Sequence, residues 1–237
     1  MMKFEQKNKN SIKLLFNQIA QNYDKLNNLI SFGFHKKIKK AVVKKSVQKL
    51  GFSPLKVLDL CCGTGDIAKE CKKSFPDAEV VAIDFSQEML DIAMKNSQGI
   101  IYLNADITNL EEIAFLEKES FDVIFISFGL RNLPDIDSFL ENIKEYLSSN
   151  GVLAILDLGK PHLLTKPYFF LHYNLIIPLF AKLFAKDIAP YKYLVRSAKK
   201  YPSQKEIIAK MEQFGYKNCQ IVNYFCGIIS QQMGQKI

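Results

Sequence analysis

The sequence predicts an α/β fold with a mostly parallel sheet and an antiparallel hairpin at its carboxyl end. Short apolar runs alternate with stretches of helical periodicity through the middle of the chain, which is typical of β-α-β units with right-handed crossovers. A glycine-rich turn after the first apolar run opens a helix, as at the ligand sites of such sheets. With 237 residues, 48% of them hydrophobic, the chain is long enough for one domain with a sizeable core.

The strands and helices are predicted in order from the periodicity of apolar residues. Five apolar runs are expected to form the parallel strands: residues 56–60, 79–84, 100–103, 121–127 and 152–157. The helical stretches between them are residues 66–74, 86–97, 109–118 and 135–148. A capping box of Ser203 and Glu206 predicts a helix over 203–214 that ends at Gly215. Two final runs, which predict the antiparallel hairpin, are residues 218–224 and 227–232.

The segments that flank this sheet differ from it in composition. Apolar residues at helical spacing predict an amphipathic helix over 11–23, and a basic helix is expected over 36–50. Residues 163–190 are rich in Phe, Leu and Ile, but polar residues interrupt them too often for a membrane span, so we interpret them as a cap or an interfacial helix pair. The single domain therefore has four parts: basic N-terminal helices (1–50), a core with the ligand site (51–157), an apolar and basic cap (158–200), and a C-terminal helix with hairpin (201–237).

Positive charge is concentrated in two of these parts. The chain carries a net charge of +8 at pH 7. Residues 1–50 hold twelve lysines against two acids, residues 158–200 hold eight basic residues against one acid, and residues 51–157 hold eight against nineteen. A Lys-rich background would give a more even excess. We therefore interpret the segregation as a surface for an anionic partner, either nucleic acid or an anionic membrane.

Cysteine usage and the N-terminus indicate a reducing compartment. The five cysteines are an odd number and form no Cys-x-x-Cys pair, so the sequence predicts neither a disulfide framework nor a metal site. The first residues are polar and lack the apolar stretch of a signal peptide. A cytoplasmic protein is therefore expected.

The most specific local pattern is a glycine loop, DLCCGTGD, at residues 59–66. Gly63 and Gly65 allow the backbone to pass close under a ligand, and the helix that starts here offers free N–H groups. Asp84 ends the second strand, where a carboxylate accepts hydrogen bonds from ribose hydroxyls. The end of the third strand adds three residues placed to contact an adenine: Asn104, Ala105 and Asp106.

Two cofactors compete for this loop. Residues 63–68 fit the dinucleotide pattern G-x-G-x-x-A, which favours a nicotinamide cofactor. Four acids, however, are expected to crowd the mouth of the site and to repel a pyrophosphate: Asp59, Asp66, Asp84 and Asp106. A cationic sulfonium ligand without phosphate, S-adenosylmethionine, suits that charge better.

A second motif, ISFGLRNLPD at residues 126–135, places Arg131 at the end of the fourth strand, where the sheet order should switch. Lysine is the usual cation of this chain, since Arg131 and Arg196 are its only arginines. We interpret the arginine here as required for its planar guanidinium, whose paired N–H donors lysine lacks. A structural tie to a loop carbonyl or to Asp135 is an equal alternative.

Three stretches together resemble a known family. They are FISFGLRN at residues 125–132, LDLCCGTGD at 58–66, and FNQIAQNYD with SFGFH at 16–24 and 31–35. In these the chain is similar to the UbiE/MenG family, S-adenosylmethionine-dependent C-methyltransferases of menaquinone and ubiquinone biosynthesis. The resemblance continues as far as GY at 215–216, so it covers nearly the whole chain. It implies a Rossmann-like class I methyltransferase fold with a seven-stranded sheet.

The resemblance also implies cofactor contacts at five residues: Thr64, Asp84, Asn104, Ala105 and Ser127. We add Phe85, which follows Asp84, as a cofactor-binding candidate. The chain departs from the family pattern at three places: Ile38-Lys39 instead of Trp-Arg, Cys61 or Cys62 instead of Gly, and Gln232 instead of His.

The implied reaction moves a methyl group from S-adenosylmethionine to a ring carbon of a prenylated quinol. Demethylmenaquinol is the expected acceptor, with the benzoquinol precursor of ubiquinone as the alternative. The protein must stabilise a phenolate next to that carbon, a role we assign to Arg131, directly or through a water. Candidates for the proton acceptor are Asp157, Tyr23 and His35, although a histidine in the position of His35 is more often a cap or a surface group.

A prenylated quinol lives in the bilayer, so the basic segments and the apolar cap are expected to contact an anionic membrane surface at its inner face. Residues 1–50 and 158–200 should then lie on one side of the sheet. An RNA methyltransferase is the competing enzyme, but the chain lacks the [DNS]-P-P-[YF] element after the fourth strand, and no nucleic acid is expected as a partner. A membrane-binding module that only senses S-adenosylmethionine is the non-enzymatic alternative, and the oligomeric state is left open.

Overall fold

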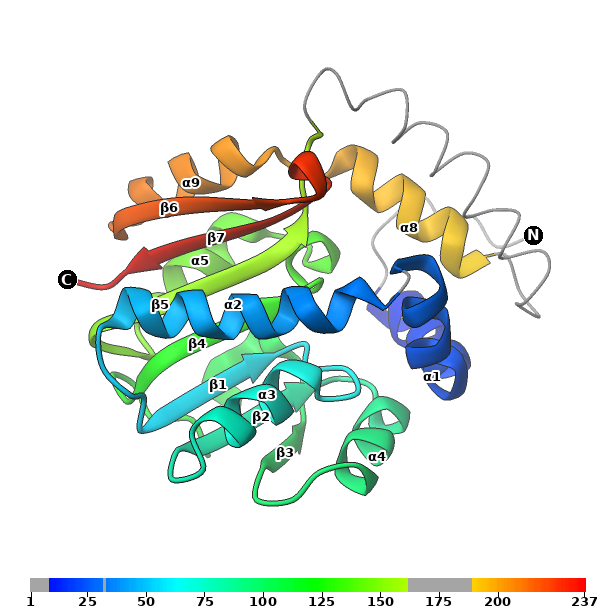
Figure 1. Cartoon of the computed structure of the whole chain (residues 1–237), viewed down its shortest axis with the longest axis horizontal. Coiled ribbons are helices and arrows are strands. Elements are labelled where there is room, and N and C mark those ends of the chain that lie inside the picture. Colours follow the sequence, from blue (N-terminus) through cyan, green and yellow to red (C-terminus); the bar gives the residue numbers. More distant parts are fainter. Residues whose placement is uncertain (1–8, 32, 162–188) are drawn as a thin grey trace.

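A seven-stranded sheet organises the part of the chain that the computed structural model describes, residues 9–31, 33–161 and 189–237 (Figure 1). Its strand order is β3-β2-β1-β4-β5-β7-β6. The strands are β1 (Lys56–Leu60), β2 (Glu79–Asp84), β3 (Ile101–Asn104), β4 (Phe121–Ser127), β5 (Leu147–Leu158), β6 (Lys217–Tyr224) and β7 (Ile229–Gln235). The first five are parallel to one another, whereas β7 is antiparallel to both β5 and β6. The predicted mostly parallel sheet with an antiparallel C-terminal hairpin is confirmed.

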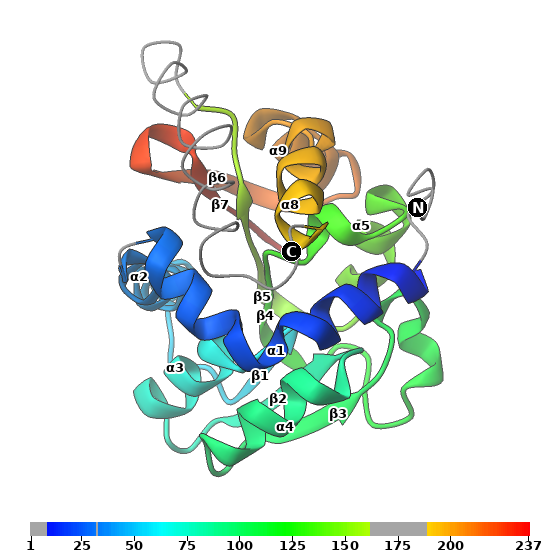
Figure 2. The same cartoon turned by 90° about the vertical axis from the view of Figure 1, so that its right-hand side faces the viewer.

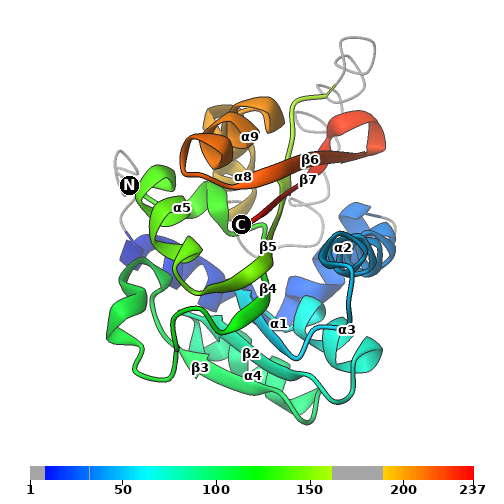
Figure 3. The same ribbon diagram turned by 90° about the vertical axis from the view of Figure 1, so that its left-hand side faces the viewer.

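Helices cover both faces and one edge of this sheet. They are α1 (Lys9–Ser31), α2 (Phe34–Leu50), α3 (Asp66–Ser74), α4 (Gln87–Lys95), α5 (Ile136–Lys144), α8 (Ala189–Lys200) and α9 (Gln204–Gln213), with 3₁₀ helices η1 (Ile107–Glu112), η2 (Leu130–Asn132) and η5 (Phe225–Gly227). In Figure 3, α2 and α3 lie on one face, and α5 and α9 lie on the other. α1 and α8 contact each other and run across the carboxyl edge of the parallel strands (Figure 2).

The strand order reverses direction at β1, because β2 lies on one side of it and β4 on the other. In open α/β sheets, ligands bind in the crevice outside the carboxyl ends of the strands at such a point. The switch at the end of β4 that the sequence predicts is therefore present. In Figure 2, α1 crosses in front of the carboxyl ends of these strands.

The central strands are buried on both faces, which explains their continuous apolar runs. Leu58 and Leu60 of β1 belong to one core cluster with Met211 of α9. Val57, which precedes Leu58, belongs to a second cluster on the opposite face with Val42 of α2. Alternate residues of one strand therefore join two different cores, as expected of a parallel sheet covered on both sides.

Two predicted helices are shorter than expected. The stretch 109–118 contributes only the end of η1, whose backbone at Asn109 departs from helical geometry. In the stretch 135–148, α5 ends at Lys144, because Leu147 pairs with Phe121 and so begins β5. In both stretches the spacing of apolar residues fits a helix. The structure buries those side chains differently, through a turn in 109–118 and through strand pairing at the end of 135–148.

The N-terminal segment occupies two different places. The amphipathic helix expected over 11–23 is part of α1, and its apolar residues Ile12, Leu15 and Ala20 are buried. α1 and α8 share the carboxyl edge as expected, whereas α2 covers the face that carries α3 (Figure 1). The cap expected over 163–190 lies outside the described residues except for the start of α8. Among the helices of the described ranges, none has the length and hydropathy that crossing a bilayer requires.

Candidate active site

A cleft opens at the carboxyl ends of β1, β2 and β4, beneath α1. It encloses about 750 Å³ of space, including the open solvent at its mouth. α1 contributes three side chains to its wall, Ile12, Phe16 and Tyr23. The strand ends and the loops after them contribute six of the predicted cofactor-binding residues: Gly63, Asp84, Phe85, Ala105, Asp106 and Ser127.

The glycine loop bends sharply under this cleft. Gly63 and Gly65 have φ angles of 55° and 80°, in the left-handed region that favours glycine. The N–H of Gly63 donates to Asp84 Oδ2 at 2.8 Å. A Cβ at Gly65 would lie 2.7 Å from the hydroxyl of Tyr102. Position 65 therefore requires glycine both for its backbone conformation and for its close packing.

Asp84 joins the loop to the ends of β2 and β3. Its carboxylate also accepts the N–H of Ser86 at 2.9 Å, and burial raises the pKa of Asp84. The carbonyl of Asp84 accepts hydrogen bonds from the Asn104 side chain at 3.1 Å and from the N–H of Ala105 at 3.2 Å. Three of the predicted cofactor contacts are thus fixed relative to one another by backbone hydrogen bonds.

Three further predicted residues complete this wall of the cleft. Asp106 accepts hydrogen bonds from the N–H and the hydroxyl of Thr108 and so caps η1. Phe85 packs edge-on against Phe16 of α1, with ring centroids 6.3 Å apart. The Oγ of Ser127 is buried and has no hydrogen-bond partner, so it is available to a bound molecule.

The four acids expected at the mouth of the site do not all face it. Asp84 and Asp106 line the cleft, but Asp59 and Asp66 do not. Asp59 is fully buried behind the loop, where it accepts the N–H of Ala68 at 3.1 Å, and burial raises its pKa to about 7. The negative potential at the mouth is therefore smaller than the sequence suggested.

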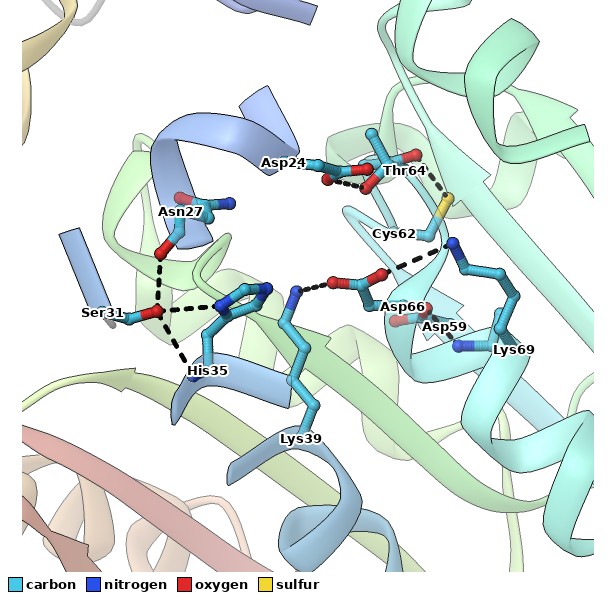
Figure 4. Close-up of polar contacts among 12 residues, drawn as sticks. Asp24, Asn27, Ser31, His35, Lys39, Asp59, Cys62, Thr64, Asp66 and Lys69 are labelled. Carbon is cyan, nitrogen blue, oxygen red and sulfur yellow. Dashed lines mark hydrogen bonds and ion pairs between the residues drawn. The ribbon is translucent and has the colours of Figure 1, made fainter. Parts of the chain in front are cut away.

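Asp66 is paired with a lysine from α2 (Figure 4). Its Oδ2 lies 2.9 Å from Lys39 Nζ, and its Oδ1 lies 3.4 Å from Lys69 Nζ. Burial opposes the charges of Lys39 and Asp66, but their attraction overrides it, which raises the pKa of Lys39 and lowers that of Asp66 to about 2. This ion pair ties α2 to the first turn of α3.

α1 is attached to the same loop by a second polar contact. The hydroxyl of Thr64 donates to Asp24 Oδ1 at 2.8 Å (Figure 4). Sequence reasoning missed both Asp24 and Lys39. A signal existed for Lys39, because it continues a helical stripe with the buried residues His35, Val42 and Ser46, and a lysine in such a stripe requires an acidic partner.

Arg131 and Asp157 form a buried pair next to the cleft. Arg131 Nη1 donates to Asp157 Oδ1 at 2.6 Å and to the carbonyl of Phe128 at 2.7 Å. The N–H of Arg131 donates to the other carboxylate oxygen at 3.2 Å. Asp135 plays no part in this pair, since it accepts hydrogen bonds from the first turn of α5. Arg131 Nε is buried without a partner.

The four catalytic candidates occupy three different places. Tyr23 lines the cleft directly. Arg131 and Asp157 lie behind Phe128 and Asn132, which line it. His35 lies at the junction of α1 and α2, where its Nδ1 is 2.8 Å from the hydroxyl of Ser31, and burial followed by the charge of Lys39 lowers its pKa. The structure thus places Tyr23 in the wall of the cleft, the Arg131–Asp157 pair behind that wall, and His35 away from it.

Sequence similarity relates the chain to one methyltransferase family. It matches the ubiE/COQ5 methyltransferase family over residues 2–236. It is 33% identical over 231 residues to the demethylmenaquinone methyltransferase of Staphylococcus aureus strain JH9, which covers 97% of this chain and 94% of that protein. The same protein from strain Newman has the same identity and coverage.

Solved structures with the same fold are also methyltransferases. A SAM-dependent methyltransferase from Thermotoga maritima has a TM-score of 0.64 and 17% identity, covering 94% of this chain and 98% of that one. The plantazolicin methyltransferase BpumL, solved with SAH and a desmethyl substrate analogue, has a TM-score of 0.64 and 19% identity, covering 96% and 98%. The predicted Rossmann-like methyltransferase fold is confirmed.

Proposed function

This chain belongs to the ubiE/COQ5 methyltransferase family, and from that membership we propose that it methylates a ring carbon of demethylmenaquinol. It is an S-adenosylmethionine-dependent methyltransferase. The observation that carries the choice of acceptor is the 33% identity to demethylmenaquinone methyltransferase over 97% of this chain. Because this similarity spans nearly the whole chain, it is not limited to the cofactor fold that many methyltransferases share.

The residues around the cleft fit the cofactor. When bound, S-adenosylmethionine supplies an electrophilic methyl group on a cationic sulfonium. We assign the Asp84 carboxylate to hydrogen bonds from ribose hydroxyls, and Asn104 and Ala105 to contact with the adenine. Asp84 and Ala105 line the cleft, whereas the Asn104 amide donates to the Asp84 carbonyl. The partnerless Oγ of Ser127 offers a further hydrogen bond. Of the remaining assigned residues, Gly63, Thr64 and Gly65 form the loop under the cofactor, and Phe85 and Asp106 flank it. Asp59 is buried behind that loop and supports it.

Arg131 is proposed to stabilise the phenolate of the acceptor. A phenol with a pKa near ~10 is mostly neutral at physiological pH and is then a weak carbon nucleophile. Asp157 and the Phe128 carbonyl hold one end of the guanidinium, which leaves the buried Nε as a free donor. Because Arg131 lies behind Phe128, this geometry favours contact through a water. Arg131→Lys should lower kcat without changing cofactor affinity, and normal turnover in that variant would contradict the role.

Tyr23 is the proton-acceptor candidate that the geometry favours. It lines the cleft, whereas both carboxylate oxygens of Asp157 already accept hydrogen bonds from Arg131. The proton of the acceptor hydroxyl passes to the Tyr23 oxygen as the Tyr23 proton leaves to water. After methyl transfer, the ring carbon loses its hydrogen as a proton and the ring oxygen regains one, so the aromatic ring is restored and one proton is released in total. Proton transfer by a positioned side chain contributes about 10²–10⁴-fold, so Tyr23→Phe should lower kcat within that range.

The aromatic residues of α1 are proposed to exclude water from the reacting atoms. Phe16 contacts both Tyr23 and Phe85 edge-on, so it closes the cleft over the β2 end. Holding two reactants in line supplies up to about 7–11 kcal/mol of the barrier reduction, provided that the geometry is fixed. Exclusion of bulk solvent, apart from the ordered water assigned above, also keeps the phenolate reactive.

The solubility of the acceptor determines where in the cell the enzyme acts. A prenylated quinol partitions into the bilayer, so we propose that the protein is cytoplasmic and contacts the inner face of the membrane peripherally. The lysines of the N-terminal segment support contact with anionic lipid.

A direct assay tests the proposed reaction. The protein is incubated with methyl-labelled S-adenosylmethionine and a demethylnaphthoquinol with a short prenyl chain, kept reduced, and the product is analysed by mass spectrometry. We expect label on the ring carbon. Label on the benzoquinol analogue alone, or on neither quinol, would overturn the assignment.

A further inference from the structure

Two phenylalanines from distant parts of the sequence meet on the protein surface. Phe34 is the first residue of α2, and Phe225 lies in η5, between β6 and β7. Their ring centroids are 5.4 Å apart with an interplanar angle of 87°. Each residue remains 45% exposed. Single exposed apolar residues are common on soluble proteins, but a contacting aromatic pair concentrates apolar surface at one place.

The backbone around Phe225 is strained. Phe225 and Cys226 have φ angles of 47° and 53°, and Gly227 continues the left-handed run at 89°. Residues with a Cβ avoid this region, and such conformations persist only where the surroundings hold them. Here the conformation places an aromatic ring at the surface against Phe34. A turn selected only for stability would place glycine or asparagine at these positions.

Two exposed lysines lie on the first turn of α2 near this aromatic pair, and one of them contacts it. Lys36 and Lys37 follow Phe34 on the first turn of α2, both are exposed, and Lys37 Nζ lies 5.4 Å from the centroid of the Phe34 ring. Acidic residues gather on the opposite face of the sheet, where Glu111, Glu112 and Asp135 line a groove between η1 and α5. The molecule therefore presents its positive, aromatic side to any anionic surface and turns its acidic side away.

The aromatic pair lies at the edge of the sheet where the cleft opens. Ile229, two residues after η5, pairs with Leu158 at the carboxyl end of β5. The cleft lies at the carboxyl ends of the neighbouring strands β1, β2 and β4. In Figure 2, which looks toward this edge, the turn between β6 and β7 and the start of α2 lie on the same side of the view. A surface that rested on this pair would bring the cleft close to it.

We propose that Phe34, Lys36, Lys37 and Phe225 form the docking surface by which this protein binds an anionic phospholipid bilayer. The two rings enter the headgroup region, and the two lysines contact lipid phosphates. The inference rests on the proposed function for its choice of partner, because a prenylated acceptor is dissolved in that bilayer. It goes further by assigning the contact to one end of α2 and one strained turn, not to the basic segments as a whole.

Vesicle sedimentation tests the docking surface with matched variants. Vesicles contain equal parts of phosphatidylglycerol and phosphatidylcholine, with pure phosphatidylcholine as the neutral comparison. Lys36→Glu/Lys37→Glu should weaken binding to the anionic vesicles at least about tenfold, since each lysine near the surface adds about a fivefold gain. Lys73→Glu/Lys95→Glu makes the same change in charge at the opposite edge of the sheet, on the last turns of α3 and α4. This control variant should weaken binding to the anionic vesicles severalfold less than Lys36→Glu/Lys37→Glu does.

The aromatic pair has its own matched control. Phe52 and Phe115 are 48% and 44% exposed and lie in loops that lead to the amino ends of β1 and β4. Phe34→Ser/Phe225→Ser should reduce binding about tenfold, whereas Phe52→Ser/Phe115→Ser should leave it unchanged. Equal effects of the two double variants would overturn the assignment.

The absence of tryptophan from this sequence allows a direct test of insertion. Phe225→Trp introduces one fluorophore at the docking surface, and Phe52→Trp introduces one at the opposite edge. Brominated lipids should quench the first and leave the second unaffected. Quenching of both or of neither would contradict the proposed orientation.

A soluble acceptor separates this inference from the proposed function. With a demethylnaphthoquinol that lacks a prenyl chain, all docking variants should turn over as the parent protein does, because none of the changed residues lines the cleft. Normal turnover with vesicle binding insensitive to the variants would overturn only the docking surface. Absence of turnover in the parent protein with both this acceptor and the short-prenyl demethylnaphthoquinol would overturn the proposed function, while vesicle binding would still decide the docking surface. Self-association that the Phe34→Ser/Phe225→Ser change abolishes, without vesicle binding, would assign the pair to a second copy of the chain and overturn the lipid assignment.

Discussion

The two sides of the cleft are built differently. On the β1–β3 side, the contacts that shape the wall are short hydrogen bonds with backbone partners, such as those from Gly63 and Ala105 to Asp84. On the β4–β5 side, the structure depends on Arg131 and Asp157, two buried side chains 26 residues apart that neutralise each other. The first side follows from the course of the backbone. The second depends on a single pair of charges, so we expect it to be far more sensitive to substitution.

The largest expected effect comes from breaking the β4–β5 side. Asp157→Asn keeps the shape of the side chain but leaves the Arg131 charge uncompensated, and both side chains are at most 7% exposed. Removing one partner of a buried pair costs about 3–5 kcal/mol of unfolding free energy. Urea unfolding followed by circular dichroism measures it.

Two further variants serve as controls for that measurement. Arg131→Met/Asp157→Leu removes both charges and should recover most of the lost stability. Lys118→Met removes one partner of Lys118–Glu145, which has the same 2.6 Å separation but is exposed to water. It should leave the urea midpoint unchanged. A destabilisation by Asp157→Asn no larger than that of Lys118→Met would remove the distinction between the two sides.

The β1–β3 side is also the part that the sequence predicts best. The β1 range 56–60, the α3 range 66–74 and the β2 range 79–84 agree with the structure residue for residue, because glycine, aspartate and short apolar runs fix the local backbone. Gly63 and Asp84 line the cleft as a local motif suggests, since strand ends in a parallel sheet meet at one edge.

The remaining features depend on contacts between distant residues. Lys39 is one of many lysines in the sequence, and only the packing of α2 on α3 shows that it meets Asp66. Asp59 and Asp66 belong to the same motif as Gly63, yet the turn of the loop directs them away from the cleft. The pair of Phe34 with Phe225 joins two ends of the chain, so no local pattern predicts it.

A second prediction concerns Asp59, which is buried behind the glycine loop on the β1–β3 side. Burial raises the pKa of Asp59 from 3.8 to about 7. An acid whose folded-state pKa lies above its unfolded value destabilises the fold progressively as pH rises between the two values. Asp59→Asn removes that cost, so its stability relative to the parent should increase between pH 4 and pH 7, by about 3 kcal/mol.

Urea midpoints measured at several pH values provide the test. Asp66 gives the opposite sign, because its pKa is lowered to about 2, and its stabilising contribution should disappear only as pH falls from about 4 toward 2. A constant difference between Asp59→Asn and the parent over pH 4–7 would show that Asp59 titrates normally.

A third prediction concerns the attachment of α2. Lys39→Met leaves Asp66 with only the longer contact to Lys69, at a site where the Asp66 side chain is 18% exposed. We expect a loss of about 1–3 kcal/mol of unfolding free energy. Asp66→Asn combined with Lys39→Met completes a double-mutant cycle, which isolates the coupling between the two groups.

Lys69→Met is the matched control for Lys39→Met. Lys69 is the second lysine paired with Asp66, but both lie on α3, so its loss breaks no contact between helices. Its cost should be smaller and should not alter the affinity for S-adenosylhomocysteine, whereas Lys39→Met should weaken it by shifting the first turn of α3. A larger effect from Lys69→Met would mean that α2 does not position the loop.

The smallest expected effect concerns α1. Thr64→Val is nearly isosteric and removes only the hydrogen bond from the Thr64 hydroxyl to Asp24, which lies at a partly exposed position. One such bond contributes about 1 kcal/mol, so global stability should hardly change, but α1 should open about fivefold more often. Amide hydrogen exchange in α1 measures this opening. Thr108→Val is the control, because its hydroxyl also donates to an aspartate at 2.8 Å but within a single loop, two residues away. If both variants speed exchange in α1 equally, Asp24 does not hold α1 to the glycine loop, and the β1–β3 side of the cleft is closed by the packing of Phe16 alone.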